Sequence, residues 1–311
     1  MSDTQRAILI ATAQTMAVDQ MTCEVVEAFR QEHIDSVLLK GPSIAQWLYP
    51  HGGRSYGDSD LLVSPGDFPR AVGVLERLGF GHPVRGRAAH AHTYRRQSAP
   101  GECVMAVDLH RSLPYITVPP TEAWRVLSTN TGTISLRGLE VAVLAVPQRI
   151  LHIAMHTLQH AFESSKPFED LRRALAVVDM ADWGAAAEIS RALGAEDALA
   201  AGLSVLPEGK EVVERLNLST SRRGILRMAS SADPDGPAYE VQRILDAPSF
   251  SERLKLMYDG VALSPAVMRS ESALARRGRG GLVLAYAYRP VQLVGRLGPA
   301  LMARRRILKR P

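Results

Sequence analysis

The segment GDSDLLV, Gly57 to Val63, carries two aspartates separated by one residue at the start of an apolar run. Successive side chains of a β-strand point to opposite faces, so Asp58 and Asp60 share one face while Leu61 and Val63 take the other. Two carboxylates on one face repel each other unless a cation lies between them, and such hard oxygen ligands suit Mg²⁺. Aspartate is also common as a turn or cap residue at strand ends, so the pair alone leaves both interpretations open.

Three further features favour the metal site. Asp108 lies in a second apolar run, VMAVDLH, from which its carboxylate could converge on the same cations. The segment LLKGPS, Leu38 to Ser43, supplies a lysine and a glycine turn at a helix N-terminus, which suits phosphate. Arg54 follows in a glycine-containing loop, where a mobile cation could neutralise charge that develops during phosphoryl transfer.

The surrounding segments predict the fold class α+β, a mixed-sheet domain followed by an all-helical domain. Residues 1–34 are expected to be helical, with a break near Asp19 and one buried stripe that starts at Ile8. Ser64 is expected to cap the next long helix, and Gly79 to end it. Helices are also expected at 41–49, 64–80 and repeatedly after 146, and strands at 35–41, 58–63, 91–97 and 103–111, the last two joined by the turn SAPGE. The predicted domains are 1–145, 146–268 and a basic amphipathic segment, 269–311.

Composition narrows the class of protein. The chain has 311 residues, enough to bury a substantial core, and only two cysteines, Cys23 and Cys103, which argues against a disulfide framework or a thiolate zinc site. The N-terminus lacks the basic and apolar regions of a signal peptide, and no uncharged apolar run reaches about 18 residues. We therefore expect a cytoplasmic protein.

The basic charge is concentrated at the C-terminus. Residues 269–311 carry a balance of +10, whereas the preceding residues carry −5. This segment mixes apolar residues with arginine, so it suits an acidic partner or peripheral binding to an anionic membrane surface; a terminal helix with solvated charges is the alternative. Nucleic acid is an unlikely partner, because the sequence has no recognisable binding module or aromatic stacking pattern.

The order of these elements resembles the uncharacterised bacterial nucleotidyltransferases of the polymerase-beta-like superfamily. In that superfamily a glycine-containing turn between strand and helix precedes a D-x-D strand, and a third acidic residue follows on a later strand. The matching residues here are Lys40-Gly41, Arg54 through GDSDLLV, the helix SPGDFPRAVGVLERLGF, and VDLH at Val107 to His110. The likeness is close over residues 35–113 and loose over the helical region that follows.

The resemblance implies roles for individual residues. The implied catalytic and metal-binding residues, which would hold two Mg²⁺ ions, are Asp58, Asp60 and Asp108. The implied binding residues for ATP or another nucleoside triphosphate are Lys40, Gly41, Ser43, Arg54 and Gly57. One position departs from the family pattern: Pro42 follows the glycine and removes a backbone donor, which shifts the expected phosphate binding toward Ser43 and Lys40.

Two other groups of polar residues have weaker signals. His152, His156 and His160 recur every four residues, so they could share one helix face as zinc ligands, but no acidic residue is interleaved and packing or a polar contact with nucleotide is favoured. Glu169 and Asp170 are expected to be solvated or paired along their helix.

The resemblance therefore implies a metal-dependent nucleotidyltransferase. The expected reaction moves a nucleoside monophosphate, AMP from ATP, onto a hydroxyl of a small molecule, a natural-product peptide or another acceptor, and releases pyrophosphate. Two alternatives remain: a protein of the same fold that binds nucleotide or a partner without turnover, and a toxin-like enzyme that modifies tRNA.

Overall fold

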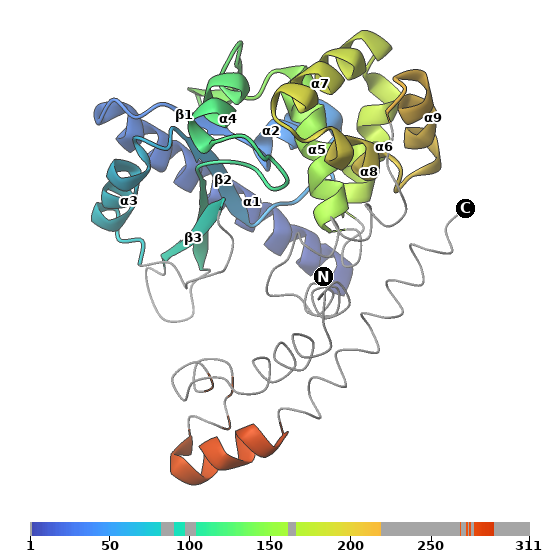
Figure 1. The fold of residues 1–311 in the computed structure, drawn as a ribbon. Coiled ribbons are helices and arrows are strands. Elements are labelled where there is room, and N and C mark those ends of the chain that lie inside the picture. Colours follow the sequence, from blue (N-terminus) through green and yellow to red (C-terminus); the bar gives the residue numbers. More distant parts are fainter. Residues whose placement is uncertain are drawn as a thin grey trace. The chain divides into compact units, whose positions relative to one another are not determined.

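The computed structural model describes residues 2–81, 90–96, 104–160, 166–218, 268, 272, 274 and 277–288 (Figure 1). Contacts between residues divide the chain into two compact units, Met1–Ser221 and Arg222–Pro311. The boundaries expected near residues 145 and 268 stay predictions.

A six-stranded mixed sheet forms the centre of the first unit. Its strands are β1 (Ser36–Leu38), β2 (Asp58–Val63), β3 (Ala91–Arg96), β4 (Met105–His110), β5 (Gly132–Leu136) and β6 (Leu139–Val143). Their order across the sheet is β3-β4-β2-β1-β6-β5, with β2 parallel to β4 and antiparallel to β1. The mixed sheet and the helices that follow it confirm the α+β prediction, and β3 and β4 pair antiparallel as expected. The predicted turn SAPGE lies outside the described residues.

One face of the sheet packs against α1 (Asp3–Gln31) and α3 (Phe68–Arg77). Leu61 and Val63 of β2 and Val107 of β4 are fully buried here, together with Val25 and Phe29 of α1. The two-residue period of the strands therefore directs the apolar side chains to this face and leaves the aspartates on the other.

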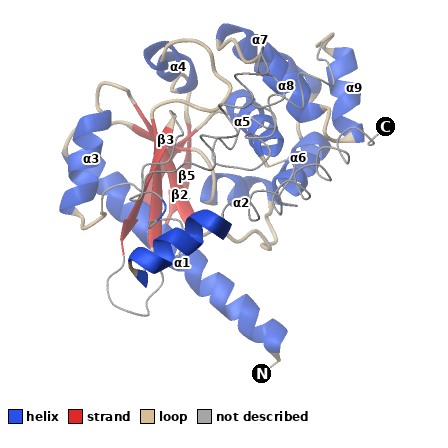
Figure 2. Ribbon diagram, turned by 60° about the horizontal axis from the view of Figure 1, so that its bottom comes forward, coloured by secondary structure: helices blue, strands red, loops and turns tan. Residues whose placement is uncertain are grey.

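Two predictions for the N-terminal helix are wrong. The helix is continuous through Asp19, and its first half is exposed, with Ile8 60% and Met16 55% accessible. A helix of 29 residues is about 43 Å long, whereas a six-residue strand spans about 20 Å, so the helix outruns the sheet that it covers. Figure 2 shows the N-terminal part of α1 extending beyond the strands.

Helices cover the opposite side of the sheet (Figure 2). They are α2 (Pro42–Leu48), α5 (Val146–Gln159), α6 (Lys166–Val177), α7 (Met180–Ala192), α8 (Glu196–Leu203) and α9 (Pro207–Arg215). Helix α5 is central to this group, because α6, α7 and α8 all pack against it, and α6 also contacts α2. The helical region thus reaches the first turn after β1.

Three local features differ from the expectations. The β5–β6 hairpin and α4 (Pro120–Leu127) were not predicted, and the long helix after β2 begins at Phe68 instead of Pro65. The hairpin turn places Arg137 and Gly138 at positive φ, a Xaa-Gly turn that is less conspicuous than Asn-Gly or Asp-Gly. Ser64 caps a separate turn by accepting a hydrogen bond from the Asp67 backbone, whereas Gly79 ends the helix at positive φ as predicted.

The second unit is described over a short stretch. Residues 279–288 are helical, and Ala285 is buried beside Met268 in a small apolar cluster. Most of the basic segment lies outside the described residues, so its acidic or membrane partner stays a prediction. Within the described ranges, no helix has the length and apolar character that crossing a bilayer requires.

Candidate active site

The three predicted aspartates lie on one face of the paired strands β2 and β4. Asp60 stands directly opposite Asp108 in the parallel register, and Asp58 stands opposite Ala106. Asp60 is 1% exposed and Asp108 is partly buried. The alternation that buries Ser59 and Leu61 against α1 therefore directs the aspartates away from that helix.

Lys40 places a cation against the central carboxylate. It lies just after β1, which is antiparallel to β2, and its Nζ is 2.8 Å from Asp60 Oδ1. Burial acts to lower the pKa of Lys40, but the nearby Asp60, Asp58 and Asp108 outweigh burial and raise it. Burial acts to raise the pKa of Asp60, yet Lys40 and His110 hold it well below its usual range. Asp60 is therefore ionised and Lys40 protonated.

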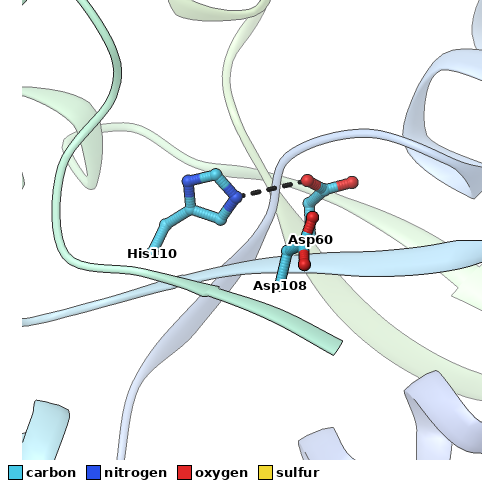
Figure 3. A group of neighbouring side chains, drawn as sticks. All are labelled: Asp60, Asp108 and His110. Atoms are coloured by element: carbon cyan, nitrogen blue, oxygen red, sulfur yellow. Dashed lines mark hydrogen bonds and ion pairs between the residues drawn. The ribbon is translucent and has the colours of Figure 1, made fainter. Parts of the chain in front are cut away.

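His110 joins the carboxylates, as Figure 3 shows. It lies two residues after Asp108 on β4, and its Nε2 is 3.2 Å from Asp60 Oδ1. One ligand atom from each of Asp60, Asp108 and His110 lies within 4.8 Å of the others. The D-x-H spacing in VDLH predicts that Asp108 and His110 share one strand face, but the contact of His110 with Asp60 depends on the pairing of β2 with β4.

Asp58 has the opposite electrostatic environment from Asp60. Burial, reinforced by the negative charge of Asp60, raises the pKa of Asp58 to about 6. A carboxylate with a raised pKa beside two other acids is a group that an added cation would keep ionised.

The site fits a divalent cation. Asp108 Oδ1 is buried and receives no hydrogen bond from the described residues. Three carboxylates, those of Asp58, Asp60 and Asp108, act on the ammonium of Lys40, and Lys166 also acts on Asp58. Carboxylate oxygens of this kind are the donors that Mg²⁺ and related cations take in proteins.

The predicted phosphate-binding turn lies beside this cluster. Gly41 has φ 63°, a backbone conformation that favours glycine, whereas a Cβ there would make only an ordinary contact with the Tyr56 ring at 3.5 Å. The Ser43 hydroxyl is buried and donates to Leu39 O at 3.1 Å, and is thus already engaged with the backbone. A Cβ at Gly57 would lie 2.8 Å from Gln14 Nε2. The nucleotide-binding roles of Gly41, Ser43 and Gly57 stay predictions.

Arg54 is anchored by a residue from the helical region. Its Nε and Nη2 each donate to one carboxylate oxygen of Asp170 on α6, at 2.8 Å. Tyr49 also donates to Asp170, at 2.7 Å, and both side chains of the ion pair are at most 5% exposed. The prediction that Asp170 is solvated or helix-paired is wrong: it is buried against the loop before β2. The signal that could have found it is helical spacing: Asp170 lies three residues after Pro167 and four before Ala174, on the buried face of α6.

The three histidines of α5 lie close to the same region. His152 is 3% exposed and bonds the backbone of Leu39, and burial lowers its pKa to about 3. The ring centroids of His152 and His156 are 6.1 Å apart, and those of His156 and His160 are 4.5 Å apart. Among the described residues the metal-competent cluster contains none of these three histidines, so zinc binding by them gains no support.

Several solved structures resemble this chain. No curated protein matches it. Among solved structures, an antigenic nucleotidyltransferase-like protein from Paracoccidioides brasiliensis is 14% identical, covering 67% of this chain and 94% of its own, with a TM-score of 0.41. The lincosamide antibiotic adenylyltransferase LnuA, lincomycin-bound, is 10% identical. The match covers 51% of this chain and 97% of LnuA, with a TM-score of 0.35. The antibiotic-resistance factor ANT(2'')-Ia is 11% identical. The match covers 57% of this chain and 89% of that factor, with a TM-score of 0.39.

A family model described as an uncharacterised nucleotidyltransferase matches residues 3–208. The match spans the sheet, the aspartate cluster and the helices from α5 into α9. The prediction of a nucleotidyltransferase is thereby confirmed at the level of family and reaction class. The chain belongs to the uncharacterised nucleotidyltransferase family.

Proposed function

We propose that the protein transfers a nucleoside monophosphate, AMP from ATP, onto a hydroxyl of a small molecule or natural-product peptide. The observation that carries the proposal is the register of β2 and β4, which sets Asp60 opposite Asp108 beside Lys40 and the Gly41 turn. The family supports nucleotidyl transfer only as a class of reaction. The nucleobase, the acceptor and the metal are our assignments.

Asp58, Asp60 and Asp108 would hold two Mg²⁺ ions. When bound, such ions neutralise the triphosphate and the pyrophosphate that leaves. Lys40, whose side chain is 18% exposed, adds a fixed positive charge next to Asp60. Arg54 also interacts with Asp60, but its charge is paired with Asp170, which fixes the position of the guanidinium. Asp60 and Lys40 stay charged near pH 7, so the field of the site is preset before substrate arrives.

The proton of the acceptor hydroxyl needs a base. We assign this role to Asp108, because a carboxylate has two oxygens, so one can bind the cation while the other takes the proton; Oδ1 has no hydrogen-bond partner among the described residues. The acceptor oxygen then forms a bond to the α-phosphorus, the bond from that phosphorus to the bridging oxygen breaks, and pyrophosphate departs. Catalysis consists of positioning and charge stabilisation.

The test is transfer of label from nucleoside triphosphates labelled at the α- or the γ-phosphorus to a panel of hydroxyl acceptors. Label from the α position must enter an acceptor, label from the γ position must leave as pyrophosphate, and Asp108→Asn must abolish both. Asp35→Asn, at an exposed position, is the matched control. Nucleotide binding without pyrophosphate release across the panel would instead support a non-catalytic binding protein.

We further propose that the protein works in the cytoplasm, on the basis of its two cysteines. A role of the basic segment at an anionic membrane surface is a separate proposal, which vesicle sedimentation of the full chain would test. Binding of tRNA that is salt-sensitive and depends on residues 269–311 would favour the toxin-like alternative.

A further inference from the structure

We propose that His110 Nε2 is a ligand of the cation held by Asp60 and Asp108, and that this position prefers a transition-metal ion to Mg²⁺. The inference rests on the proposed function, since it concerns one of the cation positions of that site. The other cation, bound mainly through phosphate oxygens, remains Mg²⁺.

The geometry brings one nitrogen and two carboxylates to a common point. Strand β4 places Asp108 and His110 on one face, and the parallel register sets Asp60 opposite Asp108. The three ligand atoms lie within 4.8 Å of one another, and His110 Nε2 is 3.2 Å from Asp60 Oδ1. Ligand atoms bound about 2.1 Å from one ion lie roughly 3 to 4.2 Å apart, so only small side-chain shifts are needed.

The imidazole is oriented for this role. His110 is 6% exposed, so its ring is held in place by packing, and Nε2 is the nitrogen that faces the carboxylates (Figure 3). Its Nδ1 is buried and has no partner among the described residues. A cation bound at Nε2 would take the lone pair of that nitrogen in place of its contact with Asp60 and would leave the ring proton on Nδ1.

The donor set decides the metal preference. Mg²⁺ takes oxygen ligands, whereas an imidazole nitrogen strengthens binding of Co²⁺, Ni²⁺ and Zn²⁺ in the usual order of divalent affinities. Neighbouring histidines do not offer the same position: His152 is engaged with Leu39, and the His90 ring centroid is 6.0 Å from that of His110. Three protein ligands leave coordination positions for substrate oxygens.

The first experiment detects the nitrogen directly. The full chain is loaded with one equivalent of Mn²⁺ and studied by pulsed electron paramagnetic resonance, once with natural-abundance nitrogen and once with ¹⁵N-labelled histidine. We expect a directly coordinated nitrogen whose coupling changes with the histidine label and disappears in His110→Asn. Asparagine retains a donor toward Asp60, and His33→Asn removes an exposed histidine as the matched control.

The second experiment measures Co²⁺ and Mg²⁺ affinities by calorimetry. His110→Asn should weaken Co²⁺ by at least about 10-fold while changing Mg²⁺ by less than about 3-fold, and thermal melts establish that the variant is folded. Bound Mn²⁺ without histidine coupling, or coupling that survives in His110→Asn, overturns the inference and leaves the proposed function intact. Cation binding with the expected coupling but no nucleotide transfer overturns the proposed function instead.

Discussion

At the residue scale, two aspartates one residue apart have opposite protonation behaviour. Asp60 contacts Lys40 and His110 and remains ionised, whereas burial and the charge of Asp60 outweigh the attraction of Lys40 and Lys166 and raise the pKa of Asp58 to about 6. The alternation along β2 gives both residues the same face, so the difference comes from what the neighbouring strands present to each one. Only Asp60 lies between a lysine from the end of β1 and a histidine from β4.

Asp108→Asn tests the proposed base. We expect nucleotide transfer to fall by at least about 100-fold, because the amide can neither take the acceptor proton nor supply a negative charge to a cation. The melting temperature should stay the same or rise, since the variant removes a partly buried charge. Transfer at the parental rate in a folded variant would refute the assignment.

Asp58 makes stability depend on pH in a defined direction. Between about pH 4 and 6 the folded, metal-free protein keeps a proton on Asp58 that the unfolded chain has released, so the contribution of Asp58 to the free energy of unfolding falls as pH rises. Burial lowers the pKa of His90 to about 4 and that of His152 to about 3, so these two histidines make the free energy of unfolding rise over the same range. The lowered pKa of Asp60 acts in the same direction as the histidines, but only below about pH 4.

Asp58→Asn should remove this contribution, so the free energy of unfolding should rise more steeply with pH in the variant than in the parent. Chemical denaturation in a chelator at pH 4.5, 5.5 and 6.5 measures it, and at pH 6.5 the variant should be more stable by about 2 kcal/mol. Asp35→Asn should keep the parental slope. A variant with the parental slope would show that Asp58 does not contribute in this range.

At the scale of elements, the loop between α2 and β2 is fastened to α6. Asp170 accepts hydrogen bonds from Nε and Nη2 of Arg54 and from the Tyr49 hydroxyl. The Arg173 guanidinium lies 4.2 Å from the centre of the Tyr49 ring. Lys166 donates a hydrogen bond to Ser55 O at 2.9 Å. The loop that leads into the aspartate strand is thus held by residues more than a hundred positions later.

Asp170→Asn should destabilise the protein, because it leaves Arg54 buried without its counter-charge. The expected cost is about 3 kcal/mol, or a melting temperature lower by about 10 °C. Glu169→Gln is the matched control. The Glu169 carboxylate pairs with Arg172 and Arg173 at the surface, so this substitution should cost less than about 1 kcal/mol. Equal effects of the two variants would contradict the buried-pair account.

Helices α5 and α8 approach so closely that only glycine fits between them. A Cβ at Gly202 would lie 2.2 Å from Ala154 O, whereas a Cβ at Gly184 of α7 would meet only Leu216 Cδ2 at 4.0 Å. Gly202→Ala should therefore destabilise by about 2 kcal/mol, and Gly184→Ala should be neutral or stabilise by about 0.5 kcal/mol through helix propensity. Thermal melts of the two variants check the opposite signs.

At the scale of the whole molecule, much of the fold follows from local sequence patterns. The D-x-D strand, the β3–β4 hairpin, Pro42 at a helix start and the helical region after residue 146 all have short-range signals, and all are found. The β5–β6 hairpin and the exposed half of α1 were missed, because an Arg-Gly turn is inconspicuous and periodicity cannot say where a sheet ends.

The composition of the site was only partly predictable, for a physical reason. Asp58, Asp60 and Asp108 carry a recognisable pattern within strands, but the partners of Arg54 and Asp60 depend on tertiary contacts. Asp170 lies 116 residues after Arg54, and the sequence does not show that the two side chains meet. The contact of His110 with Asp60 depends on the register of β2 and β4, which the sequence does not show either.

The division of the chain after Ser221 gives a prediction for truncation. All of the family match, residues 3–208, lies in the first unit, so a protein ending at Ser221 should fold and retain its cation binding. Circular dichroism melts and Mn²⁺ titration of residues 1–221 beside the full chain provide the measurement. A truncated protein without a cooperative transition would show that the later residues are needed for folding.

The pairing of Arg54 with Asp170 also bears on synthesis. A ribosome releases the sheet and its aspartates well before α6, so during translation the Arg54 guanidinium has no counter-charge and stays hydrated. The loop before β2 can take its final position only once α6 has emerged. A nascent chain arrested before that helix would therefore have a nearly complete sheet, while the loop before β2 would not yet be fixed in place.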